Sequence, residues 1–103
     1  MKTSELTGAA LDWAVSKALG EYRPVSVPNY STDWAQGGPI IEREKIDLSM
    51  QFYGWVAHHG RYRANAMNLP EYTQKADTPL IAAMRCYVAS KLGDEVEVPP
   101  DLT

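Results

Sequence analysis

The sequence has few of the residues on which catalysis, metal binding and disulfide bonding depend. It contains one cysteine, Cys86, so no internal disulfide can form. The apolar neighbours of Cys86 indicate a buried, unreactive thiol, which fits a reducing compartment. There is no Gly-x-Ser-x-Gly, His-Glu-x-x-His or Cys-x-x-Cys motif and no Walker-type glycine loop, the usual signatures of several enzyme classes. We therefore expect a protein that is not an enzyme and that holds neither a metal nor a cofactor.

The remaining reactive side chains are poorly placed to work together. Cys86 with His58 or His59 would make a nucleophile and a base, but a thiol inside an apolar helix is poorly accessible and has a raised pKa. His58 and His59 are adjacent and would point to opposite faces of a strand, which suits no shared metal. Glu42 and Glu44 diverge on a helix and do not form an acid–base pair.

The chain also lacks an excess of positive charge and a long apolar run. Its 13 acidic and 10 basic residues give a net charge of −3, whereas proteins that bind duplex nucleic acid usually carry a basic surface. No apolar run approaches the ~20 residues needed to span a bilayer, and no signal-peptide core stands at the N-terminus. We expect neither duplex nucleic acid nor a membrane as a partner, and a cytoplasmic location.

The length and composition fit one folded domain over residues 1–103. Hydrophobic residues make up 45% of the chain and charged residues 22%, which is ordinary for a globular protein. A chain of this size can bury enough apolar surface to fold without disulfides or a structural metal. The aromatic residues are three Trp, six Tyr and one Phe, so most carry a hydrogen-bonding group that suits an interface, a ligand pocket or a small core.

Apolar periodicity predicts two main helices. The first covers about residues 7–19, with Leu11, Ala14 and Val15 on one apolar face and Gly20 at its end. The second covers about residues 78–92, because Thr78 can cap a helix that has proline at its first position.

Weaker patterns predict short elements between and after these helices. Prolines favour an extended loop over residues 21–29, and Pro39 suits the start of a short helix over residues 40–44. Alternation predicts short strands near residues 46–48, 52–56 and 96–98, and residues 59–77 resemble a long loop. The expected fold class is α+β, a short antiparallel-type sheet covered by two helices. A sheet this small often leaves an exposed edge, so we expect a homo-oligomer.

The segment from Tyr30 to Pro39 is the first of two candidates for a binding site. Gly37 and Gly38 allow a tight turn whose backbone N–H groups face a ligand. Trp34 could stack on a planar group, while Asp33 and Gln36 could read its polar edges. The alternative, which the pattern alone favours, is a glycine turn in which Trp34 fills the core and Asp33 caps a helix.

Arg85 is the second candidate, because it is the only charged residue in the middle of an otherwise apolar helix. A buried guanidinium needs an anionic partner or several carbonyl groups. An internal carboxylate is the commoner partner, and an external phosphate or carboxylate is the alternative. Arg61 and Arg63 give a weaker indication of anion binding.

Three separated blocks of the sequence resemble the NinX-like family of small phage and prophage proteins. They are residues 6–15 (LTGAALDWAV), residues 30–42 (YSTDWAQGGPIIE), and residues 78–85 (TPLIAAMR) with 92–96 (LGDEV). Residues 49–77 carry no motif of this kind. The resemblance implies an accessory protein of a tailed phage, made in the host bacterial cytoplasm and absent from the virion. Small phage accessory proteins commonly disarm host functions by stoichiometric binding.

These observations lead to one leading functional hypothesis and two rivals. The first is a non-enzymatic counter-defence protein that sequesters a small anionic, nucleotide-like host signal. A protein–protein inhibitor or modulator of a host enzyme or replication factor is the alternative, with exposed Trp and Tyr side chains, Arg61 and Arg63 as anchors. The third is a small hydrolase or transferase with an unobvious site. The ligand-binding residues expected under the first hypothesis are Asp33, Trp34, Gln36, Gly37, Gly38, Trp55 and Arg85.

Overall fold

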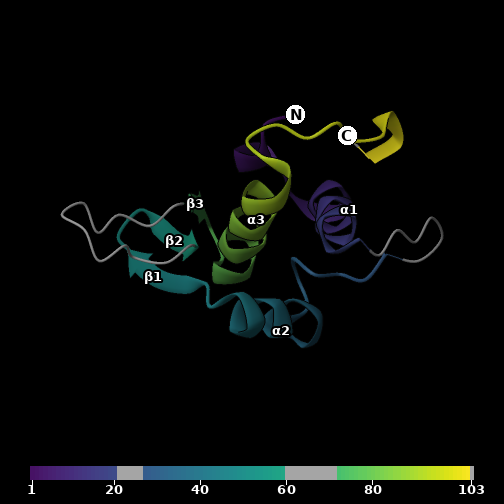
Figure 1. Cartoon of the computed structure of the whole chain (residues 1–103). Helices are drawn as coiled ribbons and strands as arrows, with labels where there is room; N and C mark the ends of the chain where they lie inside the picture. The colour runs from purple at the N-terminus through teal and green to yellow at the C-terminus, as the bar shows by residue number, and fades with distance from the viewer. Residues whose placement is uncertain (21–26, 60–71, 103) are drawn as a thin grey trace, which may run out of the picture.

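The computed structural model of the chain describes residues 1–20, 27–59 and 72–102. These form three α-helices and one three-stranded antiparallel sheet, an α+β arrangement (Figure 1). In chain order the elements are η1 (Thr3–Glu5), α1 (Gly8–Leu19), α2 (Trp34–Glu44), β1 (Asp47–Gln51), β2 (Gly54–His59), β3 (Tyr72–Ala76), α3 (Pro79–Leu92) and η2 (Pro100–Leu102).

Helix α3 lies at the centre of the molecule. It packs on β2 and β3 with one side and on α1 and α2 with the others (Figure 1). The Thr78 hydroxyl starts the helix by accepting a hydrogen bond from the Ile81 N–H at 3.1 Å, as the sequence predicted. Most of the helix surface is buried because it is apolar on nearly every side. Its buried residues are Leu80, Ala82, Ala83, Met84, Cys86, Tyr87, Val88 and Ala89.

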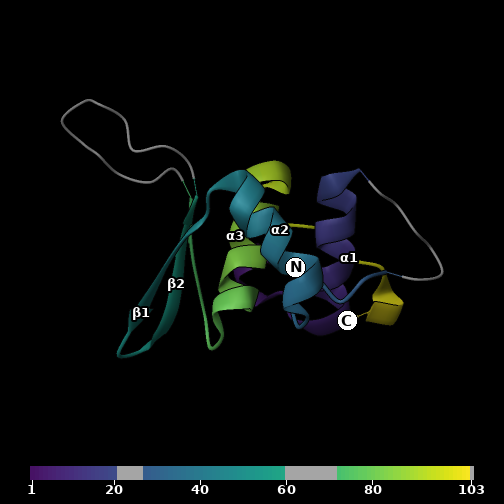
Figure 2. The ribbon, with the colours of Figure 1, turned by 90° about the horizontal axis from the view of Figure 1, so that it is seen from below.

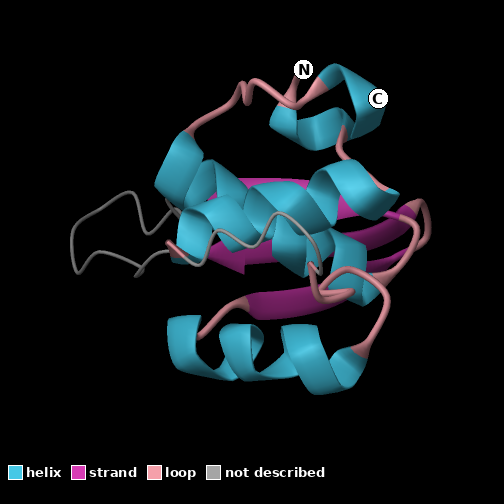
Figure 3. Ribbon diagram, turned by 90° about the vertical axis from the view of Figure 1, so that its right-hand side faces the viewer, coloured by secondary structure: helices cyan, strands magenta, loops and turns pink. Residues whose placement is uncertain are grey.

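The sheet is a meander in the order β1-β2-β3, and it lies behind the helices in the view of Figure 3. Leu48 pairs with Ala57, and Ala57 pairs with Gln74, so these residues share the face that α3 covers. Ser49, Val56 and Lys75 share the opposite face. The two main helices and the α+β fold class predicted from the sequence are thus confirmed.

The three α-helices begin at the same end of the molecule. Figure 2 shows α1, α2 and α3 running side by side in one direction, with the β1–β2 turn at the end where they start. None of the three carries an acidic residue in its first turn. No helix among residues 1–20, 27–59 and 72–102 is long and apolar enough to cross a membrane.

Helix α2 corrects the prediction of a glycine turn followed by a short helix over residues 40–44. Gly37 and Gly38 lie inside one continuous helix that already begins at Trp34. A Cβ atom on Gly37 would overlap the Tyr30 carbonyl oxygen and approach Leu80 Cδ1 to 2.7 Å. Gly37 is therefore selected by close packing of α2 against the chain before it and against α3, rather than by turn geometry.

Two further predictions about secondary structure were wrong. Strand β3 falls within residues 59–77, which resembled a loop because its sequence, YTQKA, alternates only weakly; residues 60–71 lie outside the described residues. No strand forms over residues 96–98. Instead Glu95 makes an isolated bridge with Lys2, and the Val96 N–H donates to the Met1 carbonyl at 2.9 Å. This segment pairs with the N-terminal segment of the chain rather than with the sheet.

Exchanging each glycine of α2 for alanine should have opposite effects. Gly37→Ala should lower the free energy of unfolding by about 1–3 kcal/mol, because the new methyl group has no room. Gly38→Ala should raise it by about 0.5–1 kcal/mol, because alanine favours a helix interior and the nearest atom, Trp34 Cε3, is 3.8 Å away. Urea unfolding of both variants measures the difference. Equal effects would contradict the packing role of Gly37.

Candidate functional site

The residues expected to bind a ligand at the start of α2 are engaged in the helix itself. Asp33 is the N-cap, and its Oδ1 accepts from the Ala35 N–H at 2.9 Å. The N–H groups of Gln36 and Gly37 both donate to the Asp33 carbonyl, at 3.0 and 2.9 Å. The Trp34 side chain is 52% exposed and does not fill the core. The capping role is therefore confirmed, whereas the two glycines do not offer a row of free backbone donors.

Arg85 is held by backbone carbonyl groups. Its Nε donates to the Leu6 carbonyl at 2.8 Å and its Nη1 to the Lys75 carbonyl at 2.7 Å. Burial lowers the pKa of the guanidinium, and the negative charge of Asp77 acts in the opposite direction. Of the partners considered from the sequence, two carbonyl groups hold the guanidinium, and no carboxylate among residues 1–20, 27–59 and 72–102 forms an ion pair with it. The side chain thereby ties the segment before α1 to β3.

Trp55 lies on β2, where it pairs with Met50 and Ala76 and packs partly buried against the core. It belongs to the sheet, while Trp34 belongs to α2 and Arg85 to α3. None of the seven predicted binding residues lines the pocket that the described residues form beside α1.

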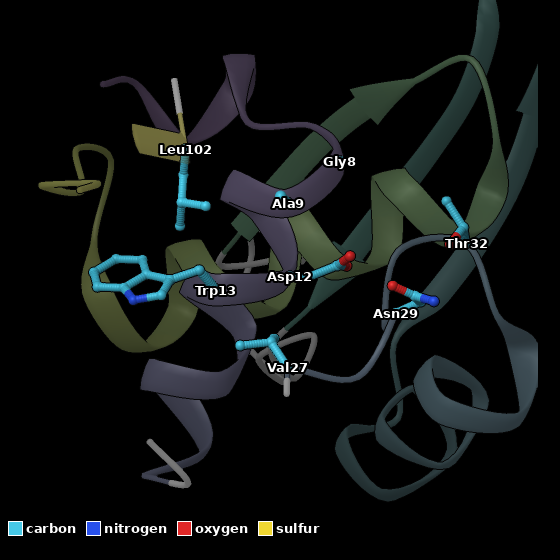
Figure 4. Close-up of a pocket in the computed structure, with 8 residues that line it drawn as sticks. All are labelled: Gly8, Ala9, Asp12, Trp13, Val27, Asn29, Thr32 and Leu102. Atoms are coloured by element: carbon cyan, nitrogen blue, oxygen red, sulfur yellow. The ribbon is translucent and has the colours of Figure 1, made fainter. Parts of the chain in front are cut away.

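A pocket of about 290 Å³ lies on the other side of the molecule from the sheet. It is formed by α1, residues 27–32 and the C-terminal η2 (Figure 4). Its size is near the lower end of typical ligand pockets, roughly 300–1,000 Å³. The lining residues are Gly8, Ala9, Asp12, Trp13, Val27, Asn29, Thr32 and Leu102.

The position of the pocket follows from the two faces of α1. Leu11, Ala14 and Val15 point into the core and are fully buried. Residues 8, 9, 12 and 13 lie one turn apart on the opposite side and form one wall of the pocket. Thr7 is the N-cap, but its side chain makes no capping hydrogen bond. The first N–H groups of α1 therefore start beside the pocket without a side-chain cap.

Asp12 is the only carboxylate among the residues that line this pocket, and it is only 6% exposed. Burial raises the pKa of Asp12, and hydrogen bonds with Ser31 oppose the rise. The Ser31 N–H donates to Asp12 Oδ1 at 2.8 Å. A carboxylate that is taken out of water destabilises the folded protein when it ionises. Perturbed ionisable groups in clefts are common at functional sites.

The opposite end of the pocket is lined by an aromatic ring, Trp13, which a cation outside the lining contacts. Trp13 is half-buried, and Figure 4 shows its indole beside the Leu102 side chain. The Lys17 ammonium lies 5.2 Å from the centre of the Trp13 ring. The pocket can thus accept a flat group with N–H or O–H donors toward Asp12, apolar surface along Trp13 and Val27, and negative charge near Lys17.

This site could not be predicted from the sequence, for a structural reason. Asp12 and Trp13 stand beside the apolar stripe of the first helix and therefore resemble surface residues. Asp12 is buried because the chain at Ser31, 19 residues later, crosses over it. A signal was present in the Asp-Trp pair next to a buried Leu11, but nothing in the helix pattern indicates which segment covers it.

A second polar cluster joins the end of α2 to β2. Glu44 Oε1 lies 3.2 Å from His59 Nε2, and Arg43 Nε donates to Glu44 Oε2 at 3.2 Å. Arg43 Nη2 also donates to the Tyr87 hydroxyl at 3.4 Å. His59 Nδ1 is buried and has no hydrogen-bond partner among the described residues. The cluster contains an acid and a base but no nucleophile.

The described residues form neither an accessible thiol at Cys86 nor a cluster of metal-binding side chains. The Cys86 thiol is fully buried, and burial raises its pKa to about 12, so the buried thiol expected from the sequence is confirmed. His58 contacts Thr73 and His59 contacts Glu44, so the adjacent histidines do diverge. Within residues 1–20, 27–59 and 72–102, no three His, Cys, Asp or Glu side chains are grouped to hold a metal ion.

Replacing Arg85 should reduce stability. Arg85→Ala should lower the free energy of unfolding by about 1–3 kcal/mol, because it leaves the carbonyls of Leu6 and Lys75 without their donor. Arg85→Lys should lose less, because the ammonium keeps one of the two hydrogen bonds. Urea unfolding measures both variants. If Arg85→Ala were as stable as the wild type, the bridging role would be wrong.

The charge on Asp12 should make stability depend on pH. The folded protein keeps this proton at pH values where the unfolded chain, with a carboxyl pKa near 3.8, has released it. The contribution of Asp12 to stability is therefore greatest in acid and falls as the pH rises through the raised pKa. Asp12→Asn removes this dependence and keeps an acceptor for Ser31. The melting temperature of Asp12→Asn minus that of the wild type should increase from roughly pH 3 to pH 8. A constant difference would contradict the raised pKa.

Most of the chain matches a known protein family. The family model described as Bacteriophage P22, NinX matches residues 24–91, which is more than half of the chain. The matched region contains α2, the sheet and α3 up to Lys91, together with one side of the pocket at Val27, Asn29 and Thr32; α1, with Asp12, lies before it. No curated protein matches the chain. On the strength of this family match, the chain belongs to the NinX family of phage proteins.

Proposed function

We propose that this phage accessory protein acts by stoichiometric binding. It holds a small nucleotide-like host molecule in the pocket between α1, residues 27–32 and η2, and it does so without turnover. Binding would lower the free concentration of such a molecule and so weaken a host defence that depends on it as a signal. The expected place of action is the cytoplasm of the infected bacterium.

One observation carries the proposal: the pocket wall contains a carboxylate, Asp12, whose burial destabilises the protein whenever it is ionised. A ligand with N–H donors would offset this destabilisation, because hydrogen bonds from a donor stabilise the carboxylate in its charged form. Nucleobases carry such donors on a flat edge. Binding would therefore recover free energy that the empty protein lacks.

The other walls support one orientation of the ligand. The base edge would face Asp12, and the ring would lie along the apolar surface of Trp13 and Val27. A phosphate group would be repelled by the Asp12 carboxylate and attracted by the Lys17 ammonium at the Trp13 ring. The two charges together favour a ligand that has donors at one end and negative charge at the other.

The ligand belongs to the class expected from the sequence, but its site differs from the expected one. Trp34 and Arg85 were expected to stack the base and neutralise the phosphate. Trp13, Asp12 and Lys17 now fill the corresponding roles, because Asp12 and Trp13 line one pocket and Lys17 lies at the Trp13 ring, whereas Arg85 is already bonded to Leu6 and Lys75.

The first test identifies the ligand and its site together. The protein purified from phage-infected cells is denatured by heat, and the released small molecules are identified by mass spectrometry. Nucleosides, mononucleotides and cyclic dinucleotides are then tested by thermal shift. We expect an intact nucleotide to be released and to raise the melting temperature of the wild type. Binding should weaken at least tenfold in Asp12→Asn and in Trp13→Leu, which corresponds to the loss of about 1.4 kcal/mol.

Trp34→Leu is the matched control, because Trp34 is also a partly exposed tryptophan in a helix but does not line the pocket. It should bind as tightly as the wild type. Loss of binding in Trp34→Leu with retention in Trp13→Leu would return the site to the start of α2. Release of a chemically altered ligand would indicate an enzyme. Co-purification of one host protein at equal stoichiometry, with no small molecule, would support the modulator of a host protein instead.

A further inference from the structure

Strand β1 forms an edge of the sheet. It pairs with β2 on one side, and its other side has no partner strand among the described residues. Edge strands are usually protected against pairing by lysine, proline, a bulge or a covering element. The β1 sequence, DLSMQ, contains neither lysine nor proline, and its five residues pair in unbroken register with β2. β3, at the other edge, carries the exposed Lys75. Among the described residues, β1 is therefore the edge open to pairing.

Apolar side chains lie on the strand that forms this open edge. Leu48 and Met50 lie on the helix-covered face, because they pair with Ala57 and Trp55. Met50 is nevertheless 73% exposed. Helix α3 is centred over β2 and β3, so the cover ends before it reaches the outer side of β1 (Figure 1). The apolar face of the sheet is thus incomplete at β1.

The turn after β1 adds a second exposed apolar group. Its two central residues are Phe52 and Tyr53, where a two-residue hairpin turn usually has Asn-Gly or Asp-Gly. Phe52 is fully exposed, and its ring meets the Tyr53 ring edge-on at 5.2 Å. Neither residue has a positive φ. The backbone of the turn does not require these aromatic residues. The Tyr53 ring contacts the Lys75 ammonium at 4.8 Å, whereas the fully exposed Phe52 indicates a role in contact with another surface.

We propose that β1 pairs antiparallel with β1 of a second copy of this chain, about a two-fold axis at Ser49, to form a continuous six-stranded sheet. A register centred on Ser49 is the one that pairs all five residues of β1 with all five of its copy. It sets Leu48 opposite Met50 of the second copy, and Asp47 opposite Gln51. Continued beyond the strand, it sets Phe52 opposite Ile46 of the second copy. No like charges face each other.

The self-complementary pattern favours a second copy over a strand from a host protein. A two-fold pair requires a strand that fits itself, with apolar residues symmetric about its centre, and β1 meets this condition through Leu48 and Met50. The pairing would cover the exposed Met50 and bring Phe52 against an apolar neighbour. The ligand pocket lies on the far side of α3, so the dimer neither requires nor obstructs it (Figure 1).

The test introduces one cysteine at the expected two-fold axis. Residues opposite each other in antiparallel strands have Cα atoms about 4.5–5.5 Å apart, within the range of about 4.4–6.8 Å that a disulfide spans. Ser49→Cys should therefore give a covalent dimer under mild oxidation, seen on a non-reducing gel. Thr73→Cys, an exposed position on the same face of β3, is the matched control and should stay monomeric. The native Cys86 is fully buried and does not compete.

Light scattering with size exclusion completes the test. The wild type should show twice the mass of the chain, and Met50→Lys should shift it to the monomer with an unchanged circular dichroism spectrum, because Met50 is exposed in the single copy. A wild type that stays monomeric at every concentration would overturn the proposal. So would equal cross-linking of Ser49→Cys and Thr73→Cys, a dimer that survives Met50→Lys, or a host strand bound at β1 in place of the second copy.

Discussion

The burial of α3 on almost every side is the constraint on which the other elements depend. The sheet, α1 and α2 each bury their apolar surfaces against this one helix, and none of them forms a comparable core with another element. Two contacts set how closely the neighbours approach. Leu80 fits against Gly37 of α2, and Arg85 reaches past the helix to the carbonyls of Leu6 and Lys75. A chain of this size has a small margin of stability, so a single well-filled centre is an economical solution.

The pocket, in contrast to this buried centre, is formed by segments at the periphery of the molecule. Its walls come from the outer face of α1, from residues 27–32 and from η2, and only α1 contacts α3 extensively. Asp12 is the exception, since it is buried and held by the Ser31 N–H. The arrangement keeps a fixed polar group at the base of the pocket, while its outer walls depend on segments with fewer contacts. Sites of this kind commonly trade some stability for binding.

The sequence predicts the helices well because the signals that define them are local. Thr78 followed by Pro79, and Gly20 after an apolar stripe, specify where helices start and stop whatever lies nearby. The errors arise where distant segments decide the outcome. Gly37 and Gly38 resemble a turn until Tyr30 and Leu80 are seen to require a helix without a side chain at position 37. β3 is recognisable as a strand only through its pairing with β2, and Asp12 is buried only because Ser31 crosses it.

The common direction of the three α-helices has a consequence for the electric field of the molecule. Aligned peptide dipoles add, so the end at which α1, α2 and α3 begin has a partial positive character. The Asp33 carboxylate at the N-cap of α2 offsets part of it, whereas α1 and α3 have threonine at the N-cap and no acidic residue in the first turn. A chain with a net charge of −3 would otherwise repel small anions from every direction. The repulsion is therefore expected to be uneven and weakest near this end, because the dipole effect is short-ranged and salt screens charges beyond about 10 Å at 0.1 M. The polarity of the backbone thus gives an acidic protein a preferred side of approach for negatively charged molecules.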